Sequence, residues 1–329
     1  MVKWFTAVLV AAAGIVPGDP ASAADQVIFQ ANWLTQGENA YMVAGKEKGF
    51  YKAAGIDLEI KRGFGSGDTL KKIVSGAATV GAADMGVVMM AIAKENVPVK
   101  CISAEYAYSP QGFWTLQSSG IKTIKDLAGK RVGVTPGNSL LVYFPLVAKA
   151  NGLEPSKVTF VNMEASALLP TLLAGQIDAM PGFATNFDLR NDDAKAQGKP
   201  LHSMPFADNG LKVYGECQFA AEATIKDKAD LLMRYMRATH KSLEWARDNP
   251  EETAKIISAA YPELKEPAVL VNHKAFMPFV FNDTSARLGL GRFDPEQVMR
   301  TFEAVKAAQN ITASPDISRF IDSRFVDQH

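Results

Sequence analysis

Residues 54–82 read AGIDLEIKRGFGSGDTLKKIVSGAATVGA, and residues 151–179 read NGLEPSKVTFVNMEASALLPTLLAGQIDA, which repeats the same pattern. Each stretch predicts a helix end, a β-branched strand, an amphipathic helix closed by glycine, and a short buried strand, which together form a βαβ unit. Two such copies, about a hundred residues apart, predict two doubly wound α/β lobes. Because open α/β sheets bind ligands at the carboxyl ends of their strands, the sequence also predicts a shared ligand cleft between the lobes.

The chain begins with the features of a secretory signal peptide. A weakly basic start precedes an apolar run from Phe5 to Val16 and then Ala21-Ser22-Ala23, an A-x-A cleavage site. This run is shorter than the roughly 18 apolar residues that a membrane helix needs. We therefore expect residues 1–23 to be removed and the mature protein to be exported to the periplasm. A buried first helix is the alternative.

Composition excludes several classes of partner. Thirty-five acidic and thirty-five basic residues balance, so no overall charge favours nucleic acid or an anionic membrane, and a small molecule is the expected partner. The two cysteines, Cys101 and Cys217, are too few for a disulfide scaffold or a cysteine zinc site. Two separately buried thiols are expected; a disulfide near the expected crossovers between the lobes is the alternative, because the compartment is oxidising.

No metal and no cofactor is predicted. The four histidines are scattered without metal-ligand spacing, and residues 63–67 contain glycines but lack the lysine and the spacing of a phosphate-binding or dinucleotide-binding loop.

The order of the predicted elements divides the chain. Strands are expected at residues 27–30, 56–60 and 99–105 in the first lobe and at 113–117, 131–134 and 158–161 in the second, with a strand at 212–218 returning to the first. From residue 226 onward the apolar pattern is helical almost throughout, which predicts a helical tail packed on the first lobe. We assign residues 24–107 and 213–329 to lobe 1 and residues 108–212 to lobe 2, joined by two crossover strands.

Four segments carry a resemblance to a known family. They are Asn32-Trp33 with the helix and strand that follow as far as Glu59, residues 63–84 with their Gly81-Ala82-Ala83-Asp84 ending, residues 124–134, and residues 172–179. Their combination resembles the periplasmic substrate-binding proteins of the nitrate, sulfonate and thiamine-precursor group of ABC importers. The resemblance implies a type II periplasmic binding fold, closure of the lobes on a ligand and docking on a membrane permease. We expect a monomer.

Aromatic residues and small-residue loops are the first candidates for ligand contacts. Trp33 follows the first strand, and in the thiamine-precursor binders the matching aromatic residue stacks on a pyrimidine; core packing is the alternative. The loops 65–69, 81–85 and 137–139 present N–H groups and hydroxyls at helix starts, which suit an anion or the edge of a polar ring; ordinary helix capping is the alternative. Ser66, Asp68 and Thr69 are residue types that cap helices.

Acidic side chains near strand ends give the second set of candidates. A carboxylate in a cleft accepts hydrogen bonds from amino groups and repels a bare anion. Because no Arg or Lys lies in the three loops, a neutral or cationic aromatic ligand is expected, with the aminopyrimidine precursors of thiamine first. The full set of predicted ligand-binding residues is Asn32, Trp33, Glu38, Phe64, Gly65, Ser66, Asp84, Met85, Glu105, Trp114, Gly137, Asn138, Ser139, Phe183, Asn186 and Glu216.

Other functions fit the same fold. A pyrimidine synthase of the fungal type shares it and uses a histidine and a cysteine-rich metal segment, whereas residues 214–219 hold one cysteine and no histidine lies near Asn32-Trp33. We therefore predict that the chain is not an enzyme and has no catalytic residues. A protein of the same fold that binds a sulfonate, nitrate or an aromatic acid, and a solute sensor for a receptor kinase, are the alternatives.

Overall fold

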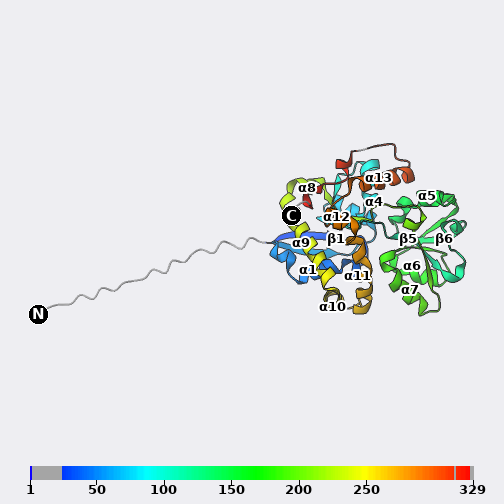
Figure 1. Cartoon of the computed structure of the whole chain (residues 1–329), viewed down its shortest axis with the longest axis horizontal. Helices are drawn as coiled ribbons and strands as arrows, with labels where there is room; N and C mark the ends of the chain where they lie inside the picture. The colour runs from blue at the N-terminus through cyan, green and yellow to red at the C-terminus, as the bar shows by residue number, and fades with distance from the viewer. Residues whose placement is uncertain (2–23, 315, 327–329) are drawn as a thin grey trace.

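The computed structural model describes Met1 and residues 24–314 and 316–326; the predicted signal peptide therefore lies outside the described residues, except for Met1. Two α/β lobes lie side by side in Figure 1, the second of them coloured green. The predicted fold class, two such lobes with a helical tail, is confirmed. The residue boundaries assigned to the lobes stay a prediction. Within the described residues, no helix combines the length and the apolar character that crossing a bilayer requires.

Lobe 1 is built on a five-stranded sheet with the order β2-β1-β3-β10-β4. β1 runs parallel to β2 and β3, and β10 runs antiparallel to β3 and β4. The strands are β1 (Asp25–Gln30), β2 (Ile56–Lys61), β3 (Val80–Asp84), β4 (Val99–Ala104) and β10 (Glu216–Ala221). The helices between them are α1 (Ala40–Glu47), α2 (Phe50–Ala53), α3 (Ser66–Val74) and α4 (Met85–Glu95).

Lobe 2 contains two smaller sheets. One has the antiparallel order β8-β5-β9, and the other pairs β6 with β7 in parallel. Val132 of β6 forms a bridge to Ala179, next to β8, which connects the two sheets. The strands are β5 (Gln111–Leu116), β6 (Arg131–Val134), β7 (Thr159–Asn162), β8 (Met180–Phe183) and β9 (Leu201–Pro205), and the helices are α5 (Leu140–Ala150), α6 (Leu168–Leu173) and α7 (Phe187–Lys195).

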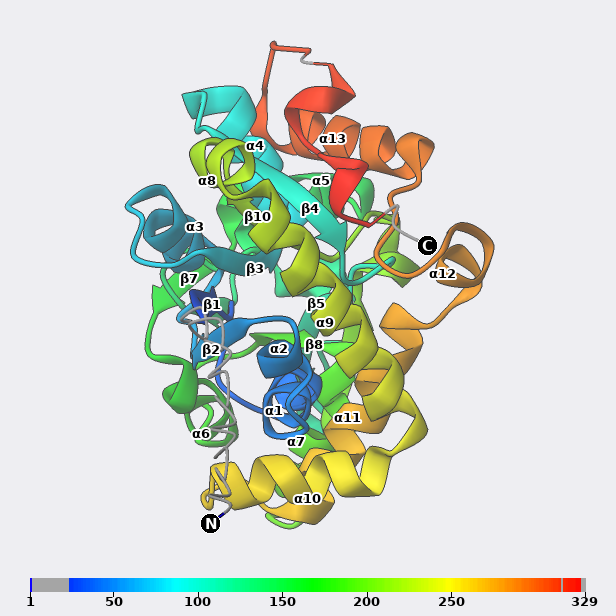
Figure 2. The ribbon, with the colours of Figure 1, turned by 90° about the vertical axis from the view of Figure 1, so that its left-hand side faces the viewer.

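The C-terminal helices pack mainly on lobe 1 and also reach lobe 2. Figure 2 shows α9 running across the face of lobe 1 between α8 and α10. Two later helices contact both lobes: α11 packs against α10 and α7, and α13 against α4 and α5. These helices are α8 (Glu222–Asp227), α9 (Ala229–Asp248), α10 (Pro250–Ala260), α11 (Glu266–Val280), α12 (Asp283–Leu288) and α13 (Pro295–Gln309).

Two crossover segments join the lobes and pair with each other. The Ser109 N–H donates to the Val213 carbonyl at 2.9 Å and the Gly215 N–H to the Tyr106 carbonyl at 3.0 Å. Residues 212–215, predicted as the start of the returning strand, form this pairing, so β10 begins only at Glu216. At the lobe 1 end, a disulfide links Cys101 of β4 to Cys217 of β10, with Cα atoms 5.8 Å apart. The disulfide therefore ties together the two strands at which the crossovers begin and end.

Candidate ligand-binding site

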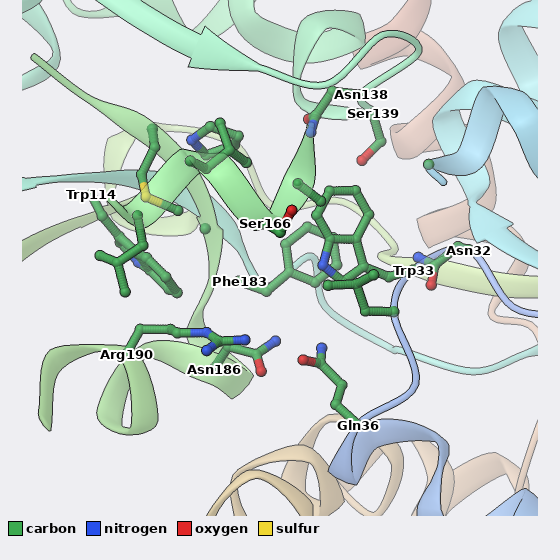
Figure 3. A pocket seen from close by; sticks show the side chains of 18 of the residues that line it. Asn32, Trp33, Gln36, Trp114, Asn138, Ser139, Ser166, Phe183, Asn186 and Arg190 are labelled. Atoms are coloured by element: carbon green, nitrogen blue, oxygen red, sulfur yellow. The ribbon is translucent and has the colours of Figure 1, made fainter. Parts of the chain in front are cut away.

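A cavity of about 380 Å³ lies between the lobes, at the carboxyl ends of β1 and β8, and Trp114 of β5 also lines it. Figure 3 shows side chains from both lobes converging on it. Lobe 1 lines it with Asn32, Trp33, Leu34, Gln36, Glu38, Gly65 and Ser66. Lobe 2 lines it with Trp114, residues 138–139, 165–166, 168–170 and 180–183, Asn186 and Arg190. Apolar side chains form most of this wall, and amides, hydroxyls, the carboxyl group of Glu38 and the guanidinium of Arg190 supply its polar groups.

The backbone after β1 fixes the position of Trp33. The Gly63 N–H donates to the Trp33 carbonyl and the Gly65 N–H to the Asn32 carbonyl, both at 2.7 Å. A Cβ atom on Gly63 would lie 2.2 Å from the Ala31 carbonyl oxygen, so only glycine fits this close backbone approach. Trp33 of lobe 1 and Phe183 of lobe 2 both line the cavity, and Figure 3 labels both side chains there. Each lobe therefore contributes an aromatic residue to the cavity wall.

Trp114 has two roles in the structure. It is 3 % exposed and packs edge-on against Phe187 with ring centroids 5.7 Å apart. Its indole also lies so close to Gly182 that a Cβ atom there would be 2.1 Å from the ring. Trp114 is thus part of the lobe 2 core and forms the far wall of the cavity.

The small-residue loops contribute in part. Gly65, Ser66, Asn138 and Ser139 line the cavity, whereas Gly137 contacts Gly67 across the lobes. The predicted side-chain cap of α3 is wrong, because the helix begins at Ser66 and its N-cap residue is Gly65.

The loop at residues 81–85 forms the end of β3 and the start of α4, and it does not line the cavity. Met85 is fully buried in the lobe 1 core, where apolar packing holds its side chain.

Phe64 points away from the cavity. Its side chain is 49 % exposed, with the Arg62 guanidinium 4.4 Å and the Lys72 ammonium 5.2 Å from the ring centroid. The contacts with these two cations hold the ring on the outer surface of lobe 1. The structure thus places Phe64 outside the candidate site.

Three of the four predicted acidic residues lie behind the cavity wall. Asp84 accepts hydrogen bonds from the Gly86 N–H at 2.9 Å, as the N-cap of α4, and from Gln111 Nε2 at 2.6 Å. Glu105 accepts from the Tyr41 hydroxyl at 2.5 Å, and Glu216 accepts from Asn32 Nδ2. None of the three lines the cavity, and each carboxyl group accepts at least one hydrogen bond from a protein donor.

Burial governs the ionisation of these carboxyl groups. It raises the pKa of Asp84 to about 7, and it raises the pKa of Glu105 and of Glu216 above the ordinary glutamate value. The neighbouring carboxylates raise the pKa of Glu216 further. Burial therefore favours the protonated form of each of these three groups over its charged form.

Glu38 lines the cavity and fastens the two lobes together. Its Oε1 accepts hydrogen bonds from the Thr185 hydroxyl and from Asn186 Nδ2, and its Oε2 accepts from Gln36 Nε2 at 2.9 Å. Asn272 of α11 supports this contact, because its side chain donates to the Thr185 carbonyl and to Asn186 Oδ1, each at 2.9 Å. Both oxygens of Glu38 are therefore already occupied by protein donors.

Sequence reasoning missed several lining residues. Arg190 is the main one. The three small-residue loops contain no basic residue, and Arg190 lies on α7, outside those loops. Gln36, Ser166 and residues 168–170 also line the cavity. Leu168 belongs to the repeated helix pattern, which predicts that one face of the helix is buried. The pattern does not predict whether that face packs in the core or lines a cavity. In the part of the chain that the structure describes, no group of three or more His, Cys, Asp or Glu residues is arranged to hold a metal ion.

Comparisons with known proteins agree with the fold. A family model described as "NMT1/THI5 like" matches residues 36–253, more than half of the chain. The riboflavin-binding protein RibY of Chloroflexus aurantiacus is 24% identical over 92% of this chain and 86% of its own length. The alkanesulfonate-binding protein SsuA of Xanthomonas axonopodis pv. citri, solved with MOPS, matches with a TM-score of 0.68 and 15% identity over 92% of this chain and 97% of its own.

The comparisons correct one prediction. The 4-amino-5-hydroxymethyl-2-methylpyrimidine phosphate synthase of Legionella pneumophila is 24% identical over 77% of this chain and 79% of its own length, and further relatives carry the same name. The prediction that the chain is not an enzyme is therefore contradicted.

Proposed function

Because the chain belongs to the NMT1/THI5-like family, we propose that it is a periplasmic solute-binding protein that captures a small planar heteroaromatic ligand between its lobes for an ABC importer. The observation that carries this proposal is the cavity between the lobes, which Trp33 of lobe 1 and Phe183 of lobe 2 both line. The proposal includes export by a cleaved signal peptide, a monomeric state and docking on a membrane permease. RibY, whose name assigns it riboflavin, supports a flat ligand.

The size and lining of the cavity support a ring-shaped ligand over a small inorganic anion. A volume of about 380 Å³ lies within the range of roughly 300–1,000 Å³ that is typical of pockets for small organic ligands. Nitrate would fill only a small part of it and would leave apolar surface in contact with trapped water. A flat ring system can cover the indole and the phenyl ring, and the amides and hydroxyls at the rim can bind its polar edge.

Replacing Trp33 tests this proposal. Trp33→Ala is expected to weaken binding about 5- to 150-fold, because losing a stacked aromatic contact costs roughly 1–3 kcal/mol. The probe is the compound that most raises the melting temperature in a panel of thiamine precursors, flavins, aromatic acids, sulfonates and nitrate. Calorimetry measures the affinity. Trp245→Ala is the matched control, because Trp245 packs on Phe50, away from the cavity. Equal affinity of wild type and Trp33→Ala would reject the stacking role.

The names of several relatives favour a second candidate function, the chemical conversion of a pyrimidine in the same cavity. Mass spectrometry of the probe recovered after prolonged incubation with the protein separates the two functions. An unchanged mass supports capture and release, and a changed mass supports conversion.

A further inference from the structure

Arg190 is the basic side chain that lines the cavity, on helix α7 of lobe 2. Figure 3 shows it next to Asn186, with Gln36 facing them from lobe 1. Among the described residues, its ion-pair partner is Asp193 on the same helix, with 3.5 Å between Nη1 and Oδ2. Asp193 is half exposed, so water screens this pair and the attraction is weak. Arg190 therefore keeps donors available to a group in the cavity.

The carboxylate nearest to Arg190 in the cavity wall does not take up these donors. Arg190 lies close enough to Glu38 to lower the pKa of that carboxyl group, against the larger effect of burial, which raises it. Both oxygens of Glu38 accept hydrogen bonds from Thr185, Asn186 and Gln36 instead. Among the described residues, no hydrogen bond joins Glu38 to Arg190.

Other polar side chains of the cavity wall also carry hydrogen-bond donors. Asn186 and Gln36, each of which donates one hydrogen bond to Glu38, line the cavity near Arg190, whereas Asn138 and Ser139 line another part of the wall. The remaining acidic candidates are buried and do not line the cavity. A guanidinium with amide donors beside it binds a carboxylate, phosphate or sulfonate in a bidentate manner. The rest of the wall, which includes Trp33, Phe183 and Leu169, is apolar.

We propose that the ligand of this cavity is a flat aromatic acid whose anionic group pairs with Arg190 while its ring lies against Trp33 and Phe183. The inference rests on the proposed function and refines it, because it replaces the neutral or cationic ligand expected from the loops. Arg190 is then the residue that selects acids over their neutral analogues.

Matched pairs of probes test this inference by calorimetry. The pairs are naphthalene-2-carboxylate with naphthalene-2-carboxamide, pyridine-3-carboxylate with pyridine-3-carboxamide, and riboflavin 5′-phosphate with riboflavin. At least one acid is expected to bind about tenfold or more tightly than its neutral partner, the scale of a hydrogen bond to a charged group. Arg190→Gln is expected to remove this preference by weakening the acid alone, and Arg190→Lys to keep part of it, because an ammonium keeps the charge and loses the fork.

Asp193→Asn is the control on the same helix. It removes the partner of Arg190 without changing the cavity, so it is expected to leave the preference for the acid intact or to increase it. The inference is overturned if no acid binds more tightly than its neutral partner, or if Arg190→Gln weakens both members of a pair equally. Trp33→Ala is expected to weaken the binding of both members of a pair. If the wild type shows no preference for acids but still loses affinity in Trp33→Ala, the inference is rejected and the proposed function stands.

Discussion

Replacing Cys101 and Cys217 together by alanine is expected to lower the free energy of unfolding by about 4–5 kcal/mol. The disulfide closes a loop with a sequence separation of 116 residues, and a cross-link of this span restricts the unfolded chain by about that amount in the chain-entropy description. Both cysteines are buried, at 1 % and 0 % exposure, so the variant also loses some core packing. Denaturant unfolding followed by circular dichroism measures the change.

Reduction provides the control for the disulfide. Dithiothreitol breaks the bond without changing the volume of the side chains, so the reduced wild type is expected to lose most of the same free energy. The double variant is expected to be insensitive to the reductant. A double variant within about 1 kcal/mol of the oxidised wild type would contradict the role given to this cross-link. The comparison also shows how far the stability of lobe 1 depends on an oxidising compartment.

The pH dependence of stability is expected to report the buried carboxyl group of Asp84. Burial raises the pKa of Asp84 to about 7, whereas its ordinary value is 3.8. Between these two values the native protein keeps the proton and the unfolded chain releases it. The native state therefore binds more protons, and its stability falls as the pH rises from about 4 to about 7. The contribution of Asp84 is complete below pH 4 and lost above pH 7.

A matched comparison isolates this contribution. The free energy of unfolding is measured at pH 5 and pH 8 for the wild type, for Asp84→Asn and for Asp188→Asn, which changes an exposed residue of α7. The gain of the wild type on going from pH 8 to pH 5 is expected to exceed that of Asp84→Asn by roughly 2–3 kcal/mol. Asp188→Asn is expected to follow the wild type. Identical pH profiles for the wild type and Asp84→Asn would show that Asp84 ionises normally in the folded protein.

Much of the fold is predictable from local patterns. The repeated stretches locate β2, α3 and β3 in one lobe and β7 and α6 in the other. Strands and helices differ in the spacing of their apolar residues, and this spacing is visible over a few residues. The crossovers are less predictable. Residues 212–215 have the composition of a strand, but the other crossover provides their hydrogen-bond partners, and this pairing depends on the positions of both lobes.

The candidate site is less predictable than the fold, for physical reasons. Trp33 and Phe64 are both aromatic and follow the neighbouring strands β1 and β2. Only the close approach of Gly63 to Ala31 and the contacts of Phe64 with cations show which ring faces the cavity. Asp84, Glu105 and Glu216 follow or begin strands as predicted, yet each is occupied by a nearby donor. Arg190 lines the cavity because the two lobes face each other. The periodic pattern of apolar residues does not predict how the lobes are placed.

Small-angle X-ray scattering tests the central claim, the capture of a solute between two lobes, most directly. The wild type is measured alone and with a saturating amount of the compound that gives the largest thermal shift. We expect the bound protein to be more compact than the free protein, with a smaller radius of gyration, because closure brings lobe 1 and lobe 2 together around the ligand. Identical scattering curves with and without every compound that binds would contradict the account.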